Sequence, residues 1–118
     1  MRKKDLPDKI RVCGKDYKVR YSNGKLTYKE KNGKRCKGNL FGFHQGNKGV
    51  IGIRLKNINE YNEPYSNDEI TNTILHESLH GLSHRFDLGL TERQVYCLGV
   101  GVQALFKDNP KIYNLLKW

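Results

Sequence analysis

Two histidines and a glutamate lie close together in the stretch ILHESLHGLSH, residues 74–84. His76 and His80 are four residues apart, so an α-helix places them on one face, about 6 Å apart along its axis. Two imidazoles placed in this way converge on one ion at the zinc–nitrogen distance of roughly 2.0–2.1 Å. Glu77 lies beside His76 and can reach a metal-activated water without binding the metal. This His-Glu-x-x-His pattern predicts zinc chemistry with Glu77 as general base.

A catalytic zinc ion takes three protein ligands and keeps one position open, so a third ligand is needed. Three side chains downstream are candidates: His84, Asp87 and Glu92. Glu92 precedes Val95 by three residues and is expected on the inward stripe of a second helix, where a buried carboxylate needs a partner such as zinc. A continuous helix would place His84 about 12 Å from His76 along the axis, too far to share one ion. We therefore predict Glu92 as the third ligand, with His84 and Asp87 as alternatives.

The helix that carries the histidines has a clear start. Ser66 and Glu69 form a capping box, Ser-x-x-Glu, which is typical of a first helical turn. Apolar residues then recur at helical spacing: Ile70, Ile74, Leu75, Leu79 and Leu82. Gly81 is a place where this helix is expected to end or fray.

A second helix is predicted after residue 90. It begins with a second capping box, made by Thr91 and Gln94. Four residues form its apolar stripe: Val95, Leu98, Val102 and Leu105. Asn109-Pro110 ends this helix and starts a short last one, IYNLLKW, because proline suits the first helical position. Residues 66–118 are thus expected to be mainly helical.

Residues 1–63 are expected to be mainly strands. KIRVCGKDYKVRY alternates apolar and polar residues around a turn at Gly14-Lys15, which predicts a hairpin. Asn23-Gly24 and Asn32-Gly33 predict two further tight turns on either side of the polar strand LTYKEK. LFGFHQ and VIGIRL flank GNKG and form another predicted hairpin. VIGIRL is the most apolar strand, expected to be well buried and to offer an edge for an extended peptide.

Length and composition fit these elements into one α+β domain, residues 1–118. We expect a small curled sheet packed on the His-Glu-x-x-His helix, with the second helix behind it. No apolar run is long enough for a membrane span, and the start MRKKDLPDKIRV has no apolar signal region. The expected location is therefore the cytoplasm, where Cys13, Cys36 and Cys97 are expected to be reduced thiols.

The net charge of +10 is distributed unevenly. Residues 1–40 hold 14 Lys and Arg against 4 Asp and Glu, whereas residues 41–118 hold 8 of each kind. Such a basic region is typical of contact with nucleic acid or another acidic partner, or of a well-solvated sheet surface. The second interpretation is favoured, because no nucleic-acid-binding motif accompanies the charge.

The segment ILHESLHGL, followed by Glu92 in LTERQV and by a helix running to KDNP, resembles small phage and prophage zincin-type metallopeptidases near the minigluzincin and ImmA/IrrE-like groups. The resemblance spans most of the chain, and its specific part is residues 74–92. It implies a zincin-like fold in a bacterial host cell, zinc ligands His76, His80 and Glu92, and Glu77 as general base. It does not single out a group that stabilises the transition state, for which four residues are candidates: Tyr61, Tyr65, Tyr96 and His84.

The sequence therefore predicts a zinc-dependent metallopeptidase, expected as a monomer acting on a peptide or protein. The alternative hypothesis is a non-catalytic basic module that binds DNA or an acidic host protein, with zinc structural or absent. A closed fourth coordination position, or a basic surface remote from the zinc, would favour this alternative.

Overall fold

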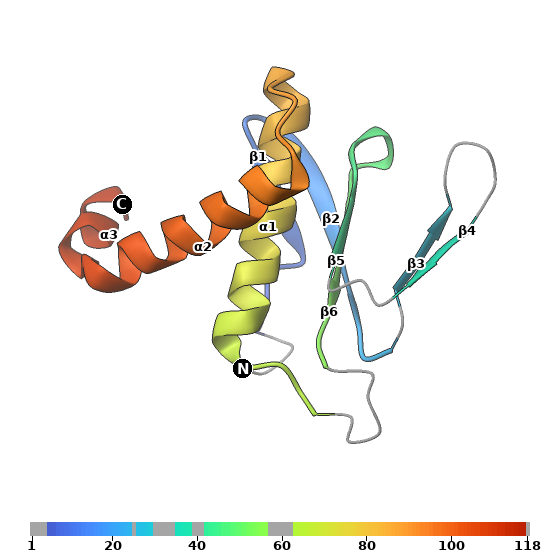
Figure 1. Cartoon of the computed structure of the whole chain (residues 1–118), viewed down its shortest axis with the longest axis horizontal. Coiled ribbons are helices and arrows are strands. Elements are labelled where there is room, and N and C mark those ends of the chain that lie inside the picture. Colours follow the sequence, from blue (N-terminus) through green and yellow to red (C-terminus); the bar gives the residue numbers. More distant parts are fainter. Residues whose placement is uncertain (1–4, 25, 30–34, 39–41, 57–62, 118) are drawn as a thin grey trace.

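The structure is a computed structural model that describes residues 5–24, 26–29, 35–38, 42–56 and 63–117. A four-stranded mixed sheet has the strand order β1-β2-β6-β5, and a separate two-stranded ribbon is formed by β3 and β4 (Figure 1). The elements are β1 (Lys9–Val12), β2 (Lys15–Ser22), β3 (Leu26–Lys29), β4 (Arg35–Gly38), β5 (Gly42–Gln45), β6 (Val50–Arg54), α1 (Asn67–Phe86), α2 (Glu92–Asp108) and α3 (Pro110–Leu116). The predicted α+β class is confirmed, and its zincin-like character stays a prediction.

The first predicted hairpin is present. β1 and β2 pair antiparallel, and Val12 lies opposite Lys15 at the closed end. Cys13 and Gly14 make the turn with φ angles of 47° and 86°, one residue earlier than the predicted Gly14-Lys15 pair. Two successive positive φ angles suit a two-residue turn whose twist matches that of the strands.

The hairpin around GNKG is also present, as β5 and β6 joined by the 3₁₀ turn η2 (Gly46–Lys48). Ile51 and Ile53 of β6 are fully buried, as predicted for the most apolar strand. However, β6 pairs in parallel with β2 on one side and antiparallel with β5 on the other. The prediction that VIGIRL offers an edge is therefore wrong. A continuous apolar run is typical of an interior strand, and β5 takes the edge position.

The hairpin predicted at Asn23-Gly24 is wrong. Gly24 lacks the positive φ angle that such a turn needs, and its backbone N–H instead donates to the Ser22 hydroxyl at 3.1 Å. β2 is paired on both sides by β1 and β6, so β3 pairs with β4 away from this sheet. The second predicted Asn-Gly turn, at Asn32-Gly33, lies outside the described residues.

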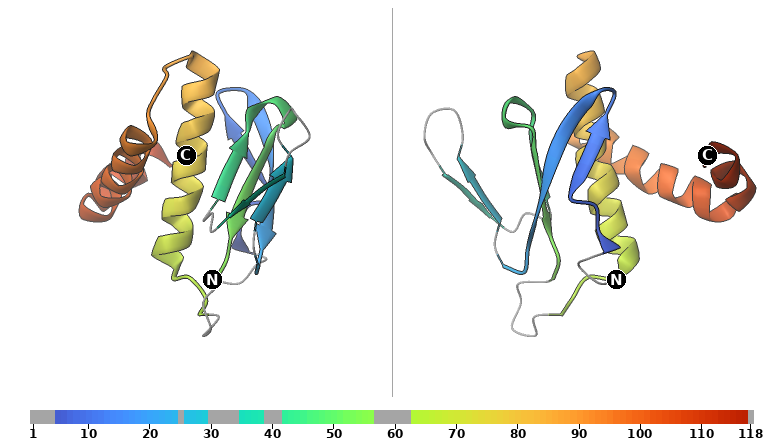
Figure 2. Two further views of the ribbon diagram at one scale, coloured as in Figure 1. Left: turned by 45° about the vertical axis from the view of Figure 1, so that its right-hand side comes forward. Right: turned by 180° about the vertical axis from the view of Figure 1, so that it is seen from behind.

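One face of the four-stranded sheet forms the core with α1. The buried cluster joins strand residues to the first turns of α1 and comprises Leu6, Val12, Tyr17, Val19, Ile51, Ile53 and Ile70. Figure 2 shows α1 between the sheet and α2, so the helix is covered on two sides. This layered arrangement holds the predicted histidine helix firmly against the sheet.

α1 starts where the sequence predicts, at Ser66, and both hydrogen bonds of the capping box with Glu69 are present. It does not end at Gly81 but continues to Phe86, so that prediction is wrong. Gly81 is buried against the sheet, where a small residue gives close packing. The helix ends at Asp87, whose backbone is left-handed with φ 51°.

The later helices begin as predicted, α2 at a capping box of Thr91 and Gln94 and α3 at a proline. The predicted apolar stripe of α2 is only partly covered, because Val95 is buried while Leu98 and Leu105 are 44% and 49% exposed. No helix in the described ranges is long and apolar enough to cross a membrane. Two of the cysteines are exposed free thiols, Cys13 and Cys97, and the Cys36 side chain lies outside the description.

Candidate metal centre

α1 presents His76 and His80 from successive turns. Their Nε2 atoms are 3.2 Å apart, and their rings meet edge to face with centroids 4.9 Å apart. α2 crosses α1 at this level, because a Cβ atom added at Gly99 of α2 would lie 3.8 Å from the backbone nitrogen of His76. The histidine pair therefore lies beside the α1–α2 crossing.

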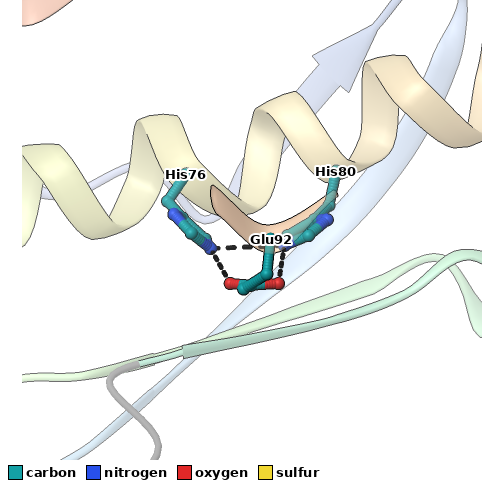
Figure 3. Close-up of side chains that lie close together, drawn as sticks. All are labelled: His76, His80 and Glu92. Carbon is teal, nitrogen blue, oxygen red and sulfur yellow. Dashed lines mark hydrogen bonds and ion pairs between the residues drawn. The ribbon is translucent and has the colours of Figure 1, made fainter. Parts of the chain in front are cut away.

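Glu92, the first residue of α2, brings its carboxylate to both histidines (Figure 3). Its Oε1 lies 2.5 Å from Nε2 of His76, and its Oε2 lies 3.0 Å from Nε2 of His80. One ligand atom from each of the three residues falls within 4.8 Å of the others. The structure thus brings together the three residues predicted as ligands. The reason given for Glu92 was wrong, since its side chain is 73% exposed rather than buried on an inward stripe.

The connection between the two helices explains how Glu92 reaches the histidines. Ser83, in the last turns of α1, accepts the Leu90 N–H with its hydroxyl at 3.0 Å and the Leu88 N–H with its carbonyl at 2.9 Å. The chain after α1 is therefore folded back along the helix. Thr91 then caps α2, so Glu92 begins that helix opposite the two imidazoles.

The donor set fits a zinc ion. Two ligands of a tetrahedral zinc site, each roughly 2.0–2.1 Å from the ion, are about 3.3 Å apart, and the two Nε2 atoms are 3.2 Å apart. Two imidazoles and one carboxylate are a known catalytic zinc set that keeps one position open. The side chains of His76 and His80 are 20% and 24% exposed, so solvent reaches the donors.

Glu77 is three residues before His80, so it lies on the flank of α1 next to the donors, and it faces the sheet. It is only 4% exposed, and its Cγ would be 3.1 Å from a Cβ atom added at Gly42 of β5. Burial, followed by the negative charge of Glu92, raises the pKa of Glu77 to about 8. A cation held by the neighbouring donors would oppose this rise, because it favours the carboxylate. Glu77 is thus suited to accept and return a proton near neutral pH.

The two alternative third ligands lie elsewhere. The exposed His84 is one turn beyond His80 on the continuous helix, beside Gly46 and with its ring centroid 5.9 Å from that of His44. Asp87 is the residue that ends α1. Neither belongs to the group of converging donors, which among the described residues consists of His76, His80 and Glu92.

The sequence interpretation missed His44. It lies on β5 opposite the buried Ile51, so it faces α1, and its ring stacks at 6.4 Å from that of His80. Burial, then the charges of His80, His84 and Lys15, lowers the pKa of His44 to about 4, so its imidazole is neutral near pH 7. The alternation along GFHQ, aligned with the neighbouring hairpin strand, was the signal that could have placed this histidine on the α1 side.

The candidates for stabilising a transition state are spread over the molecule. Tyr61 lies outside the described residues. Tyr65 precedes α1, and its hydroxyl accepts a hydrogen bond from Arg54. Tyr96 is 58% exposed and lies one helical turn after Glu92, so it is the tyrosine nearest in the chain to the converging donors.

No protein-family model, curated protein or solved structure matches this chain. The functional interpretation therefore rests on the geometry of the site.

Proposed function

We propose that this protein is a zinc-dependent metallopeptidase in which His76, His80 and Glu92 hold the ion and Glu77 is the general base. The observation that supports this most is the convergence of two imidazole nitrogens of α1 with a carboxylate from the start of α2, all within 4.8 Å. Two histidines that only belonged to the surface of a helix would not require a carboxylate from a second helix beside them.

The residues divide the chemistry between them. When bound, zinc would supply a Lewis acid that polarises the scissile carbonyl and makes water more acidic. The Glu77 carboxylate, adjacent to His76 but outside the donor group, would take the proton from the attacking water and deliver it to the departing amine. Burial favours the return of the proton, because it raises the pKa of Glu77, whereas a bound cation would favour the ionised base that takes up the proton, because it lowers that pKa again.

The strand that would align a peptide is β5, the terminal strand of the sheet next to α1. A terminal strand of a sheet can pair with an extended backbone. On its side towards α1, β5 carries Gly42 next to Glu77 and His44 next to His80. A peptide lying along β5 would thus pass close to the general base, which replaces the role first expected of VIGIRL.

The alternative, a binding module with structural zinc, requires a closed coordination shell. The exposure of the three donor side chains instead supports an open position that a substrate can reach. The two interpretations differ most clearly in whether there is any hydrolysis to lose.

The test compares the wild type with Glu77→Gln, both expressed with added zinc. Zinc per chain is measured by elemental analysis, and hydrolysis is followed on a mixed protein substrate and as self-cleavage. We expect about one zinc ion in each form and a loss of hydrolysis of roughly 10²–10⁴ in the variant. Glu63→Gln, which changes an exposed acid before α1, is the matched control and should keep full activity.

Three results would contradict the proposal. Absence of zinc from both forms would exclude the metal centre. Loss of zinc in Glu77→Gln alone would make Glu77 a ligand. Unchanged hydrolysis with zinc retained would assign the reaction to another base or to a contaminating protease.

A further inference from the structure

The face of the four-stranded sheet that is turned away from α1 carries exposed cations. Alternation along β1 and β2 sends Val12, Tyr17 and Val19 into the core and the residues that alternate with them to the opposite face. Four of these outward residues are exposed and basic: Lys9, Arg11, Lys18 and Arg20. Part of the charge imbalance of the sequence is thus gathered on one surface, which we call the basic face.

The arrangement of these cations destabilises the sheet, and nothing in the fold itself requires cations at these positions. Lys9 lies directly opposite Lys18 across the β1–β2 pair, and like charges in such positions destabilise a sheet. Arg20 follows Lys18 by two residues, roughly 7 Å along the same side of the strand. Among the residues of the four strands, the acid is Asp16, which lies 3.8 Å from Lys9 and 3.7 Å from Arg11. Exposed contacts of this length stabilise little, so a stronger anion can replace Asp16.

The composition of the basic face favours nucleic acid over a protein partner. Protein interfaces are centred on aromatic and apolar side chains and are depleted of lysine, whereas interfaces with DNA are strongly positive. The tyrosines of β2, Tyr17 and Tyr21, pack against the core instead. Among the described residues of the four strands, the ring on this face is that of Phe43, which lies over Gly52 and is only 5% exposed. It is therefore not open to stacking by an unpaired base, as single-strand binding requires.

We propose that the basic face docks on the phosphate backbone of double-stranded DNA through Lys9, Arg11, Lys18 and Arg20. Contacts of lysine and arginine to phosphates position a protein without reading bases, so the binding is independent of sequence. The candidate metal donors His76 and His80 belong to α1, which covers the opposite face of the sheet (Figure 2). Docking in this way would leave the centre open to proteins. The inference stands apart from the proposed peptidase activity and is tested without it.

The experiment measures binding of a short fluorescent DNA duplex by anisotropy over a range of salt concentrations, with metal-free protein. Four phosphate contacts predict a slope of log K against log salt of about −3 to −4. Replacing Lys9, Arg11, Lys18 and Arg20 together by glutamine should bring the slope close to zero and weaken binding at low salt at least about tenfold. The matched control replaces four exposed cations of the helices by glutamine: Arg85, Lys107, Lys111 and Lys117. It removes the same net charge and should largely keep the slope.

Asp16→Asn gives a second test, in which the affinity for DNA is expected to increase. A variant that failed to fold would not bind DNA more tightly. Removal of this acid should strengthen binding, because Lys9 and Arg11 then face the phosphates alone. The proposal is overturned if the wild type does not bind at low salt, if the two quadruple variants lose affinity equally, or if Asp16→Asn does not bind more tightly. Tighter binding of single-stranded DNA or duplex RNA of equal length would overturn the choice of duplex DNA.

Discussion

The two sides of α1 differ in how much solvent reaches them. The side facing the sheet is closed: Glu77 is 4% exposed, and Gly81 is buried next to it. The side on which Glu92 meets the two histidines is more open, with His76 and His80 at 20% and 24% exposure and Glu92 at 73%. One helix thus holds an acid whose pKa is raised by burial and, within three residues of it, two candidate metal donors that solvent can reach.

This difference separates the two requirements of the proposed hydrolytic metal centre. A general base benefits from burial, because burial moves the pKa of a carboxylate towards neutral pH. A metal donor group benefits from access, since the ion and the substrate must both enter. In this fold the α-helical period of 3.6 residues places adjacent residues, His76 and Glu77, on different sides of the helix.

The largest expected effect concerns the open side. Glu92→Ala should weaken zinc binding by more than the roughly 10–100-fold that loss of an outer-shell partner costs, because it removes one of three donors. Zinc affinity is measured by competition with a chromogenic chelator. His84→Ala is the control and should leave the affinity nearly unchanged, since His84 lies beside Gly46 rather than in the donor group. The reverse order of effects would make His84 the third ligand.

The next effect concerns the closed side and its pH dependence in the metal-free protein. The pKa of Glu77 is raised from 4.5 to about 8, so its contribution to stability is full below pH 4.5 and is lost as pH rises to about 8. The pKa of His44 is lowered from 6.5 to about 4, so its contribution is lost in the other direction, as pH falls below 6.5. Burial lowers the pKa of His80 as well, with the same sign.

Between pH 6.5 and about 8 the Glu77 contribution therefore dominates. The free energy of unfolding should fall by up to about 1.4 kcal/mol per pH unit in this window. Urea denaturation in the presence of a chelator measures it. Glu77→Gln has no group to ionise and should give a flat profile. A slope that persists in this variant would assign the titration to another residue.

A smaller effect is expected where the two sides are linked, at Ser83. Ser83→Ala leaves the Leu90 N–H without its acceptor and should cost about 1–3 kcal/mol of stability. It should also weaken zinc binding, because this hydrogen bond fixes the connection that delivers Glu92. Ser78→Ala is the matched control: its hydroxyl donates to Ile74 within the same helix, so zinc binding should not change. Equal zinc affinity in both variants would show that the connection holds Glu92 without Ser83.

Local signals in the sequence were sufficient for the helices and their starts. The capping boxes at Ser66 and Thr91, and the proline at the start of α3, act through neighbouring residues, so the pattern alone identified them. Sheet order was less accessible. The Asn23-Gly24 turn was favoured locally, but β2 gained partners from β1 and β6 instead, and pairing between distant strands leaves no local signature.

The candidate site also combines features that local sequence patterns predict with features that only the fold determines. The spacing of His76 and His80 predicted their convergence, because a helix fixes it. Glu92 was predicted from an inward stripe that the structure does not show, and it reaches the histidines through the fold-back at Ser83. His44 was missed because its place beside His80 depends on the β5–β6 register and on the packing of α1 against the sheet.

The smallest expected effect tests the closed side at Gly81, where the sequence suggested a helix end. A Cβ atom added there would lie 3.5–3.7 Å from Val12, Tyr17 and His44, which is ordinary van der Waals contact. Glycine within a helix costs roughly 0.5–1 kcal/mol relative to alanine. Gly81→Ala should therefore stabilise the protein by about that amount in urea denaturation.

Gly101→Ala in α2 is the matched control, since a Cβ atom added there meets nothing within 4 Å. It reports the helical preference of alanine alone, without a new contact. A gain at both positions means that the sheet accepts the additional methyl group against α1. A loss at Gly81 beside a gain at Gly101 would mean either that α1 packs on the sheet more tightly than described, or that the helix ends at Gly81. The second case would free His84 from the helix, and the choice of Glu92 over His84 would then have to be reconsidered.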